Sequence, residues 1–116
     1  MAQVGGVLPD DRPRIGRLGE KIAADFLARR GAVVVARNVE SPVGEIDLIV
    51  RLGGELAAVE VRTARRNDYA PDLMAYKKEQ QVRRVAASLE TPIFRVDLVT
   101  VLLQPDGVKV RWIPRL

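Results

Sequence analysis

The 116-residue sequence contains neither cysteine nor histidine, and its aromatic residues are limited to one Trp, two Tyr and two Phe. Without cysteine there is no disulfide, no zinc–thiolate site and no thiol nucleophile. Without histidine, Ser-His-Asp triads and histidine-bound zinc are also excluded. Any catalysis would therefore depend on carboxylates, Lys, Arg, hydroxyl groups, or a hard cation such as Mg²⁺ that is bound through oxygen.

No apolar run approaches the roughly 18 residues that a membrane-spanning helix needs, and the N-terminus lacks the basic and apolar regions of a secretion signal. We therefore expect a cytoplasmic protein with no membrane anchor. Lys and Arg number 19 against 15 Asp and Glu, and the resulting net charge of +4 permits a polyanionic partner without requiring one. The chain length and the hydrophobic content of 47% predict one compact domain.

Hydrophobic periodicity predicts an α/β domain over residues 14–116, after a flexible N-terminal tail at residues 1–13. A helix is expected over residues 14–30 from an apolar stripe of Ile15, Leu18, Ile22 and Phe26, and Gly19 beside this stripe would allow close approach to another backbone. Strands are expected at residues 32–38, 45–51, 55–62, 93–103 and 108–113, with a second helix from Pro71 to about Leu89. The order αβββαββ is typical of a mixed β-sheet flanked by helices.

The dipeptide Gly53-Gly54 separates two alternating runs and predicts a tight β-hairpin. If these glycines form the centre of the turn, the numbers of facing residues sum to 107, so Asp47 faces Glu60. By the same register Glu45 faces Arg62, and all four side chains share one face of the hairpin. The other face would consist of apolar residues: Ile46, Leu48, Val59 and Val61.

The facing acids Asp47 and Glu60 need a physical explanation, because like charges opposite each other destabilise an antiparallel pair. One carboxyl could be protonated, Arg62 could neutralise the pair, or both acids could share a divalent cation. Mg²⁺ suits the last option, since it takes one or two carboxylates and leaves other positions to water and phosphate. Phosphodiester hydrolysis is then the natural chemistry. The alternative is that these residues form the solvated polar face of an ordinary hairpin.

Two strings of residues, 44–49 (Gly-Glu-Ile-Asp-Leu-Ile) and 59–63 (Val-Glu-Val-Arg-Thr), resemble the signature of the YraN-like family of small bacterial proteins. This family lies in the restriction-endonuclease-like PD-(D/E)xK nuclease superfamily. Further matches are found at Gly16-x-x-Gly19-Glu20, Arg37-Asn38, Lys78 and Arg95-Val96-Asp97. The resemblance covers about residues 15 to 101 and implies a restriction-endonuclease-like fold similar to that of Holliday-junction resolvases.

The resemblance also implies roles for the acids and for one arginine. Asp47 and Glu60 would bind Mg²⁺ or Mn²⁺, and Glu20 would add a further metal or water contact. We predict Glu45 as another outer carboxylate of this catalytic group. Arg62 stands in the lysine position of the motif, and because a guanidinium stays protonated it cannot act as a general base. It can still stabilise the negative charge of a pentavalent phosphorane.

Basic and polar residues near these acids are predicted to contact a nucleic-acid backbone: Arg37, Asn38, Arg65, Arg66, Lys77 and Lys78. A strand-end turn for the first two and a solvated helix face for the lysines are the alternative interpretations. The small number of aromatic residues argues against recognition by base stacking and favours contacts to duplex or branched DNA. A homodimer would suit a cut through both strands, because two equivalent sites then meet two strands.

These features support functions from different classes. The first hypothesis is a magnesium-dependent endonuclease-like protein acting on structured DNA, and the opposed acids favour it. The second is a catalytically weak or inactive nucleic-acid-binding module with the same fold, which Arg62 favours. The third is an interaction domain whose acidic face binds a basic protein partner.

Overall fold

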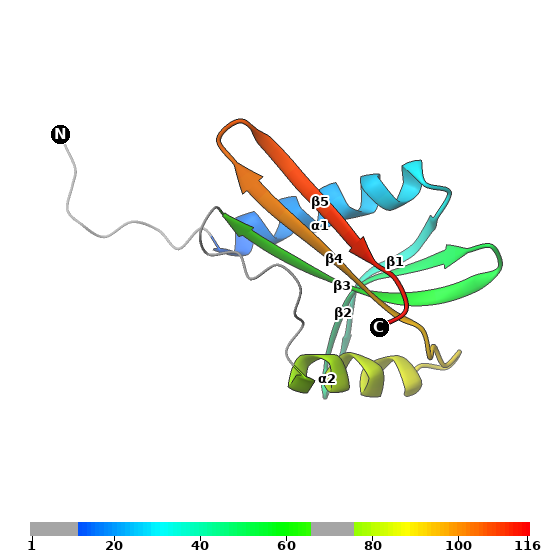
Figure 1. Cartoon of the computed structure of the whole chain (residues 1–116). Helices are drawn as coiled ribbons and strands as arrows, with labels where there is room; N and C mark the ends of the chain where they lie inside the picture. The colour runs from blue at the N-terminus through cyan, green and yellow to red at the C-terminus, as the bar shows by residue number, and fades with distance from the viewer. Residues whose placement is uncertain (1–11, 66–75) are drawn as a thin grey trace, which may run out of the picture.

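The computed structural model describes residues 12–65 and 76–116, which form two helices and five strands (Figure 1). In chain order these are α1 Arg12–Arg29, β1 Val33–Ser41, β2 Gly44–Leu52, β3 Glu55–Arg65, α2 Tyr76–Ala87, β4 Val96–Gln104 and β5 Gly107–Ile113. The helix α1 begins inside the segment that we predicted as a tail, since Pro13 fits the first turn of a helix. The predicted start of the second helix at Pro71 lies outside the described residues, and this helix ends at Ala87 instead of about Leu89.

The strands form one mixed sheet in the order β1-β2-β3-β4-β5. Neighbouring strands are antiparallel except β3 and β4, which run parallel. A parallel pair needs a crossover connection, and α2 lies in the segment between these two strands. The predicted α/β class, a mixed sheet flanked by helices in the order αβββαββ, is confirmed.

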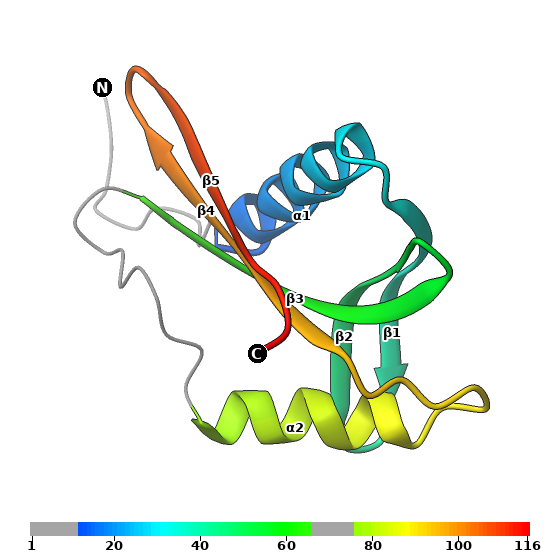
Figure 2. The same cartoon turned by 45° about the vertical axis from the view of Figure 1, so that its right-hand side comes forward.

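The two helices lie on opposite faces of the sheet, which gives three layers (Figure 2). On the α1 face the buried core includes Ala23, Ala24, Leu27, Leu48, Val50, Ala57, Val59, Val99 and Val101. On the α2 face it includes Ile46, Ile49, Ala58, Val82, Val85, Ala86, Val96 and Leu98. Consecutive residues of the central strands therefore enter different cores, as expected for a sheet that is covered on both sides. In the part of the chain that the structure describes, neither helix has the length and apolar character needed to cross a membrane.

The buried stripe of α1 is made of smaller residues than its pattern predicts. Its buried members are Gly19, Ala23, Ala24 and Leu27, whereas Leu18 is 46% exposed, so its assignment to the core-facing stripe is wrong. The reason is a close approach, because a Cβ added at Gly19 would collide with the Thr63 side chain on β3. The helix does approach β3 closely at Gly19, but the atoms it meets are those of the Thr63 side chain, whereas the prediction was another backbone.

The hairpin of β2 and β3 has the predicted turn and register. Gly53 and Gly54 adopt φ angles of 55° and 87°, a region that favours glycine. The paired residues run from Leu52 opposite Glu55 to Leu48 opposite Val59. In each of these pairs the two residue numbers sum to 107, as the diglycine turn predicts.

The alternation of side chains in β2 breaks next to Asp47. Ile46 packs in the core on the α2 face, while Leu48 packs in the core on the α1 face. The prediction that Ile46 and Leu48 share a face is therefore wrong. Asn38 of β1 lies across from Asp47, one step beyond the pair of Arg37 with Leu48, and its φ is 50°. A left-handed residue within a strand bends it and redirects the side chains that follow.

The limits of three strands differ by three residues from those predicted. β3 continues to Arg65 instead of ending at residue 62. β1 continues to Ser41, because the turn to β2 is confined to residues 42–43. β4 begins at Val96 instead of Ile93. The Ile93 N–H is bonded to the Ala86 carbonyl at 3.0 Å, so this part of the chain closes the end of α2 before the strand starts.

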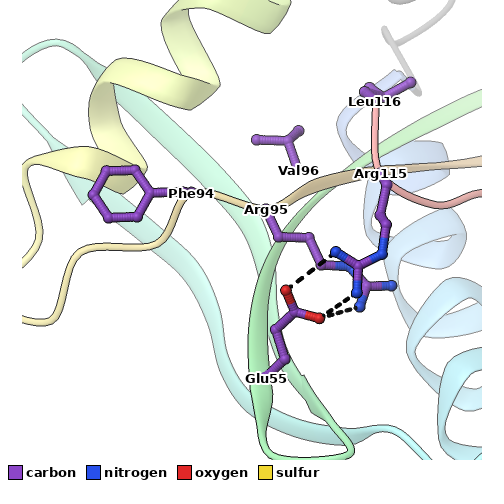
Figure 3. Close-up of a pocket in the computed structure, with 6 residues that line it drawn as sticks. All are labelled: Glu55, Phe94, Arg95, Val96, Arg115 and Leu116. Atoms are coloured by element: carbon purple, nitrogen blue, oxygen red, sulfur yellow. Dashed lines mark hydrogen bonds and ion pairs between the residues drawn. The ribbon is translucent and has the colours of Figure 1, made fainter.

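A buried acid anchors one end of the sheet. Asp97 is 0% exposed and accepts hydrogen bonds from Arg95 (2.9 and 3.1 Å), the Trp112 indole (2.9 Å) and the Arg115 backbone N–H (3.1 Å). Figure 3 shows the Arg95 and Arg115 guanidinium groups converging on Glu55, which follows the β2–β3 turn. This cluster joins the start of β4, the chain after β5 and the hairpin turn.

The pocket drawn in Figure 3, of about 330 Å³, is lined by the same charged groups together with Phe94, Val96 and Leu116. Glu55 accepts hydrogen bonds from both Arg95 and Arg115, so the charges that line the pocket are paired with one another. We therefore assign these charged groups a structural role.

Replacing Asp97 tests the anchoring role of this cluster. Asp97→Asn removes the negative charge that pairs with the mostly buried Arg95, and breaking one side of a buried ion pair costs about 3 kcal/mol or more in the free energy of unfolding. Glu55→Gln, at a side chain of the same cluster that is 42% exposed, is the comparison, and its loss should be smaller because exposed ion pairs contribute little. Urea unfolding measures both, and equally small losses would contradict the role of Asp97.

Candidate active site

Asp47 and Glu60 meet where β2 and β3 diverge. The backbone pairing of these strands stops at Leu48 opposite Val59. The next hydrogen bond is made by a side chain, because the Val61 N–H donates to Asp47 Oδ2 at 2.8 Å. From here β2 turns toward α2 whereas β3 continues beside β4 (Figure 2). The Asp47 carboxylate therefore lies at the fork between the two strands.

Glu60 is buried, at 6% exposure, and its carboxylate is incompletely paired. Lys78 Nζ lies 3.8 Å from Glu60 Oε2, which is too far for a hydrogen bond. Glu60 Oε1 has no hydrogen-bond partner among the described residues. Burial and the neighbouring Asp47 raise the pKa of Glu60 to about 8, and the positive charges of Lys78 and Arg62 act in the opposite direction.

The helix α1 brings Glu20 into electrostatic range of this fork. Its position follows from Gly19, whose missing side chain lets the helix lie against β3. Burial raises the pKa of Glu20, and the charges of Asp47 and Glu45 raise it further. A hydrogen bond from the Asn38 side chain lowers the pKa of Glu20. Asn38 therefore acts on a carboxylate of the site, a role that the sequence analysis did not predict.

Glu45 and Arg62 do not form the predicted cross-strand pair. The described ladder of β2 and β3 ends before it reaches Glu45, because the strands diverge at Asp47. Glu45 instead lies opposite Glu40 of β1. Arg62 is half-buried beside β4, and its positive charge lowers the pKa of Glu60. Arg62 therefore acts on the acid pair electrostatically.

The pair of Asp47 and Glu60 fits Mg²⁺ or Mn²⁺ as a site with two carboxylates. Its donors are hard oxygens, one of which, Glu60 Oε1, has no other partner in the described chain. Mg²⁺ commonly uses one or two carboxylates and keeps several waters. Across residues 12–65 and 76–116, no group of three or more Asp, Glu, His or Cys residues converges closely enough to form a larger ligand set. The role of Glu20 as a third ligand stays a prediction.

The basic residues predicted to contact nucleic acid lie on several elements. The exposed ones are Arg37 on β1, Arg65 at the end of β3 and Lys77 in the first turn of α2. Arg66 lies outside the described residues.

The sequence analysis missed the approach of Lys78 to Glu60, and no local spacing signals it, since the two residues belong to separate elements that meet only through packing.

The raised pKa of Glu60 predicts that the stability of the folded chain depends on pH. Its pKa of about 8 in the folded chain lies above the ordinary value of 4.5, so the unfolded state loses this proton first as the pH rises. The contribution of Glu60 to stability is fully present below 4.5 and is lost as the pH rises to about 8. The difference between the two pKa values corresponds to a loss on the order of 5 kcal/mol without divalent cations.

The measurement is urea unfolding of the wild type and of Glu60→Gln across this pH range. The variant has no carboxyl to ionise at this position, so its free energy of unfolding should fall less between the two limits. The same pH dependence in both proteins would show that Glu60 is not the group responsible.

Comparison with known proteins places the chain in a family. The model of the uncharacterised protein family UPF0102 matches residues 19–101. A UPF0102 protein of Dictyoglomus turgidum is 33% identical over 106 residues, which cover 84% of this chain and 90% of the relative. The UPF0102 protein STH1475 of Symbiobacterium thermophilum is 39% identical over 102 residues, which cover 81% and 86%. A solved structure titled "Crystal structure of SSO0001" aligns with a TM-score of 0.41 and 17% identity, and the alignment covers 86% of this chain and 50% of that chain. The chain belongs to the uncharacterised protein family UPF0102, which is the YraN-like family that its motifs predicted.

Proposed function

We propose that this chain is a magnesium-dependent endonuclease-like protein that hydrolyses phosphodiester bonds in structured DNA. The observation that supports this most strongly is the buried pair of Asp47 and Glu60, in which Glu60 Oε1 lacks a partner within the described residues. Buried polar atoms in folded proteins normally have partners. A divalent cation is the partner that suits two adjacent carboxylates.

In the proposed reaction, Asp47 and Glu60 would hold Mg²⁺ or Mn²⁺. Such an ion supplies Lewis-acid stabilisation of a phosphoryl oxygen and makes water easier to deprotonate. The Val61 N–H orients the Asp47 carboxylate. Arg62 keeps its charge at every relevant pH and stabilises the negative charge of the pentavalent phosphorane. Glu20 lies on the α1 side, where its carboxylate accepts a hydrogen bond from the approaching water.

The proposed substrate follows from charge and from the kinds of side chain present. The net charge is +4, and Arg37 on β1, Arg65 at the end of β3 and Lys77 on α2 are exposed cations. Such cations bind phosphates and carry no sequence preference of their own. With few aromatic residues for base stacking, backbone contacts to duplex or branched DNA are the proposed mode of binding. A twofold dimer would present two sites to two strands.

A catalytically weak or inactive nucleic-acid-binding module is the second candidate function. The observation in its favour is Arg62, which stands in the motif position of lysine. A lysine can change its pKa, lose its proton and help to position water. A guanidinium does not lose its proton and cannot act in this way. Under this alternative, the fold and the cations bind DNA without cutting it.

Metal binding is tested by titration calorimetry with Mg²⁺ and Mn²⁺. Asp47→Asn keeps an oxygen acceptor for the Val61 N–H but removes the charge, so the affinity should fall by at least about tenfold. Asp25→Asn, which alters an exposed carboxylate paired with Lys21, is the control and should bind as the wild type does. Equal affinities for the wild type and Asp47→Asn would refute the proposal that Asp47 and Glu60 bind the metal.

Cleavage is tested by incubating branched, flapped and linear DNA with the protein and Mn²⁺. We expect cleavage by the wild type, none by Glu60→Gln, and faster cleavage by Arg62→Lys if the arginine limits catalysis. If no DNA is cut but binding persists and weakens with salt, the second candidate is the correct one.

A further inference from the structure

Lys78 approaches the acid pair from the helix on the other side of the fork. It lies in the first turn of α2, and its ammonium is 3.8 Å from Glu60 Oε2. The Lys78 side chain is 40% exposed, whereas the Glu60 side chain is 8% exposed. A solvated cation therefore faces a buried carboxyl group whose second oxygen has no partner in the described chain.

The contact between Lys78 and Glu60 is looser than other ion pairs on the helices. Lys21 and Asp25 are 3.2 Å apart, and Arg83 and Glu79 are 2.9 Å apart, both within hydrogen-bond distance. At 3.8 Å the Lys78 ammonium interacts with Glu60 through charge alone. Because no hydrogen bond has to be broken, this cation can leave at small cost. The long flexible side chain of lysine allows that movement.

A metal ion held by Asp47 and Glu60 would lie beside the Lys78 ammonium, and like charges repel. If Glu60 is ionised, the metal adds two units of positive charge near Lys78. If Glu60 is protonated, the metal replaces a proton and still adds one unit. In both cases Lys78 opposes metal binding.

We propose that Lys78 is a displaceable counter-ion of the acid pair. Its ammonium stays beside Glu60 in the metal-free protein, moves away when a divalent cation binds, and then contacts a phosphate of the DNA. The first two steps require only that Asp47 and Glu60 bind a divalent cation, whereas the last step rests on the proposed function. Arg62, the other cation near Glu60, has the smaller effect on that carboxyl and lies within the sheet.

This role predicts opposite effects on metal and on DNA. Removing the ammonium takes away a repulsive charge, so the metal should bind more tightly. The same change removes a phosphate contact, so DNA should bind less tightly once the metal is present. A purely structural role for Lys78 would weaken both, and a simple DNA contact would leave metal affinity unchanged.

The first experiment measures Mn²⁺ affinity by calorimetry without DNA. Lys78→Met should bind Mn²⁺ about 3- to 10-fold more tightly than the wild type. Lys78→Arg, which keeps the charge, should restore wild-type affinity. Lys77→Met removes an exposed lysine one residue away and should change the affinity by less than about twofold, because charges in water are screened. Unchanged or weaker binding by Lys78→Met would overturn the proposal.

The second experiment measures how DNA affinity depends on salt, with and without Ca²⁺ as a probe of the metal site. With Ca²⁺, Lys78→Met should lower the number of counterions released by about one. Without Ca²⁺ the wild type and Lys78→Met should release equal numbers, because the ammonium is still beside Glu60. Lys77→Met should lower the number equally in both conditions. The same loss for Lys78→Met with and without Ca²⁺ would overturn the proposal.

These outcomes separate the counter-ion role from the proposed function. Tighter Mn²⁺ binding by Lys78→Met, with no DNA cleavage by the wild type, would support the displacement and refute the nuclease. Cleavage by the wild type, with unchanged Mn²⁺ affinity in Lys78→Met, would refute the displacement and support the nuclease. A wild type that binds no Mn²⁺ would overturn both.

Discussion

The site depends on one hydrogen bond, in which a side chain takes the place of the main chain. The Asp47 carboxylate accepts the Val61 N–H at the point where the ladder of β2 and β3 stops. This bond satisfies the backbone donor while the two strands diverge. The divergence leaves the two acids between elements from both faces of the sheet, with Glu20 of α1 in electrostatic range of Asp47 and Lys78 of α2 beside Glu60. An unbroken ladder would have placed main-chain atoms where the carboxylates now lie.

Two buried acids of the sheet, Asp97 and Glu60, differ in how completely their carboxylate oxygens are paired. Asp97 is surrounded by donors from Arg95, Trp112 and Arg115, and its charge is matched within the fold. Glu60 has a distant ammonium and one oxygen without a described partner. Proteins usually pair their buried polar groups, and departures from this rule are found mainly at functional sites. The contrast is the reason for assigning Asp97 to stability and for proposing Glu60 as a metal ligand.

Local patterns predicted the fold well, but the site only in part. The diglycine turn and the period-two alternation were sufficient for the register as far as Leu48. They failed at Ile46, where the alternation of β2 breaks next to the position opposite Asn38, and the positive φ of Asn38 does not appear in the pattern of β2. The contact of Lys78 with Glu60 also could not be predicted, since it exists only after α2 packs on the sheet.

The close contact of Gly19 with Thr63 has a mechanical consequence. The α1 backbone rests directly on a β3 side chain, with no compressible layer between them, and closely packed interiors transmit strain instead of absorbing it. Helix and strand therefore behave as a single rigid body in this region. Glu20 is carried by this helix, so its carboxylate moves relative to β3 by rotating its own torsion angles between staggered rotamers.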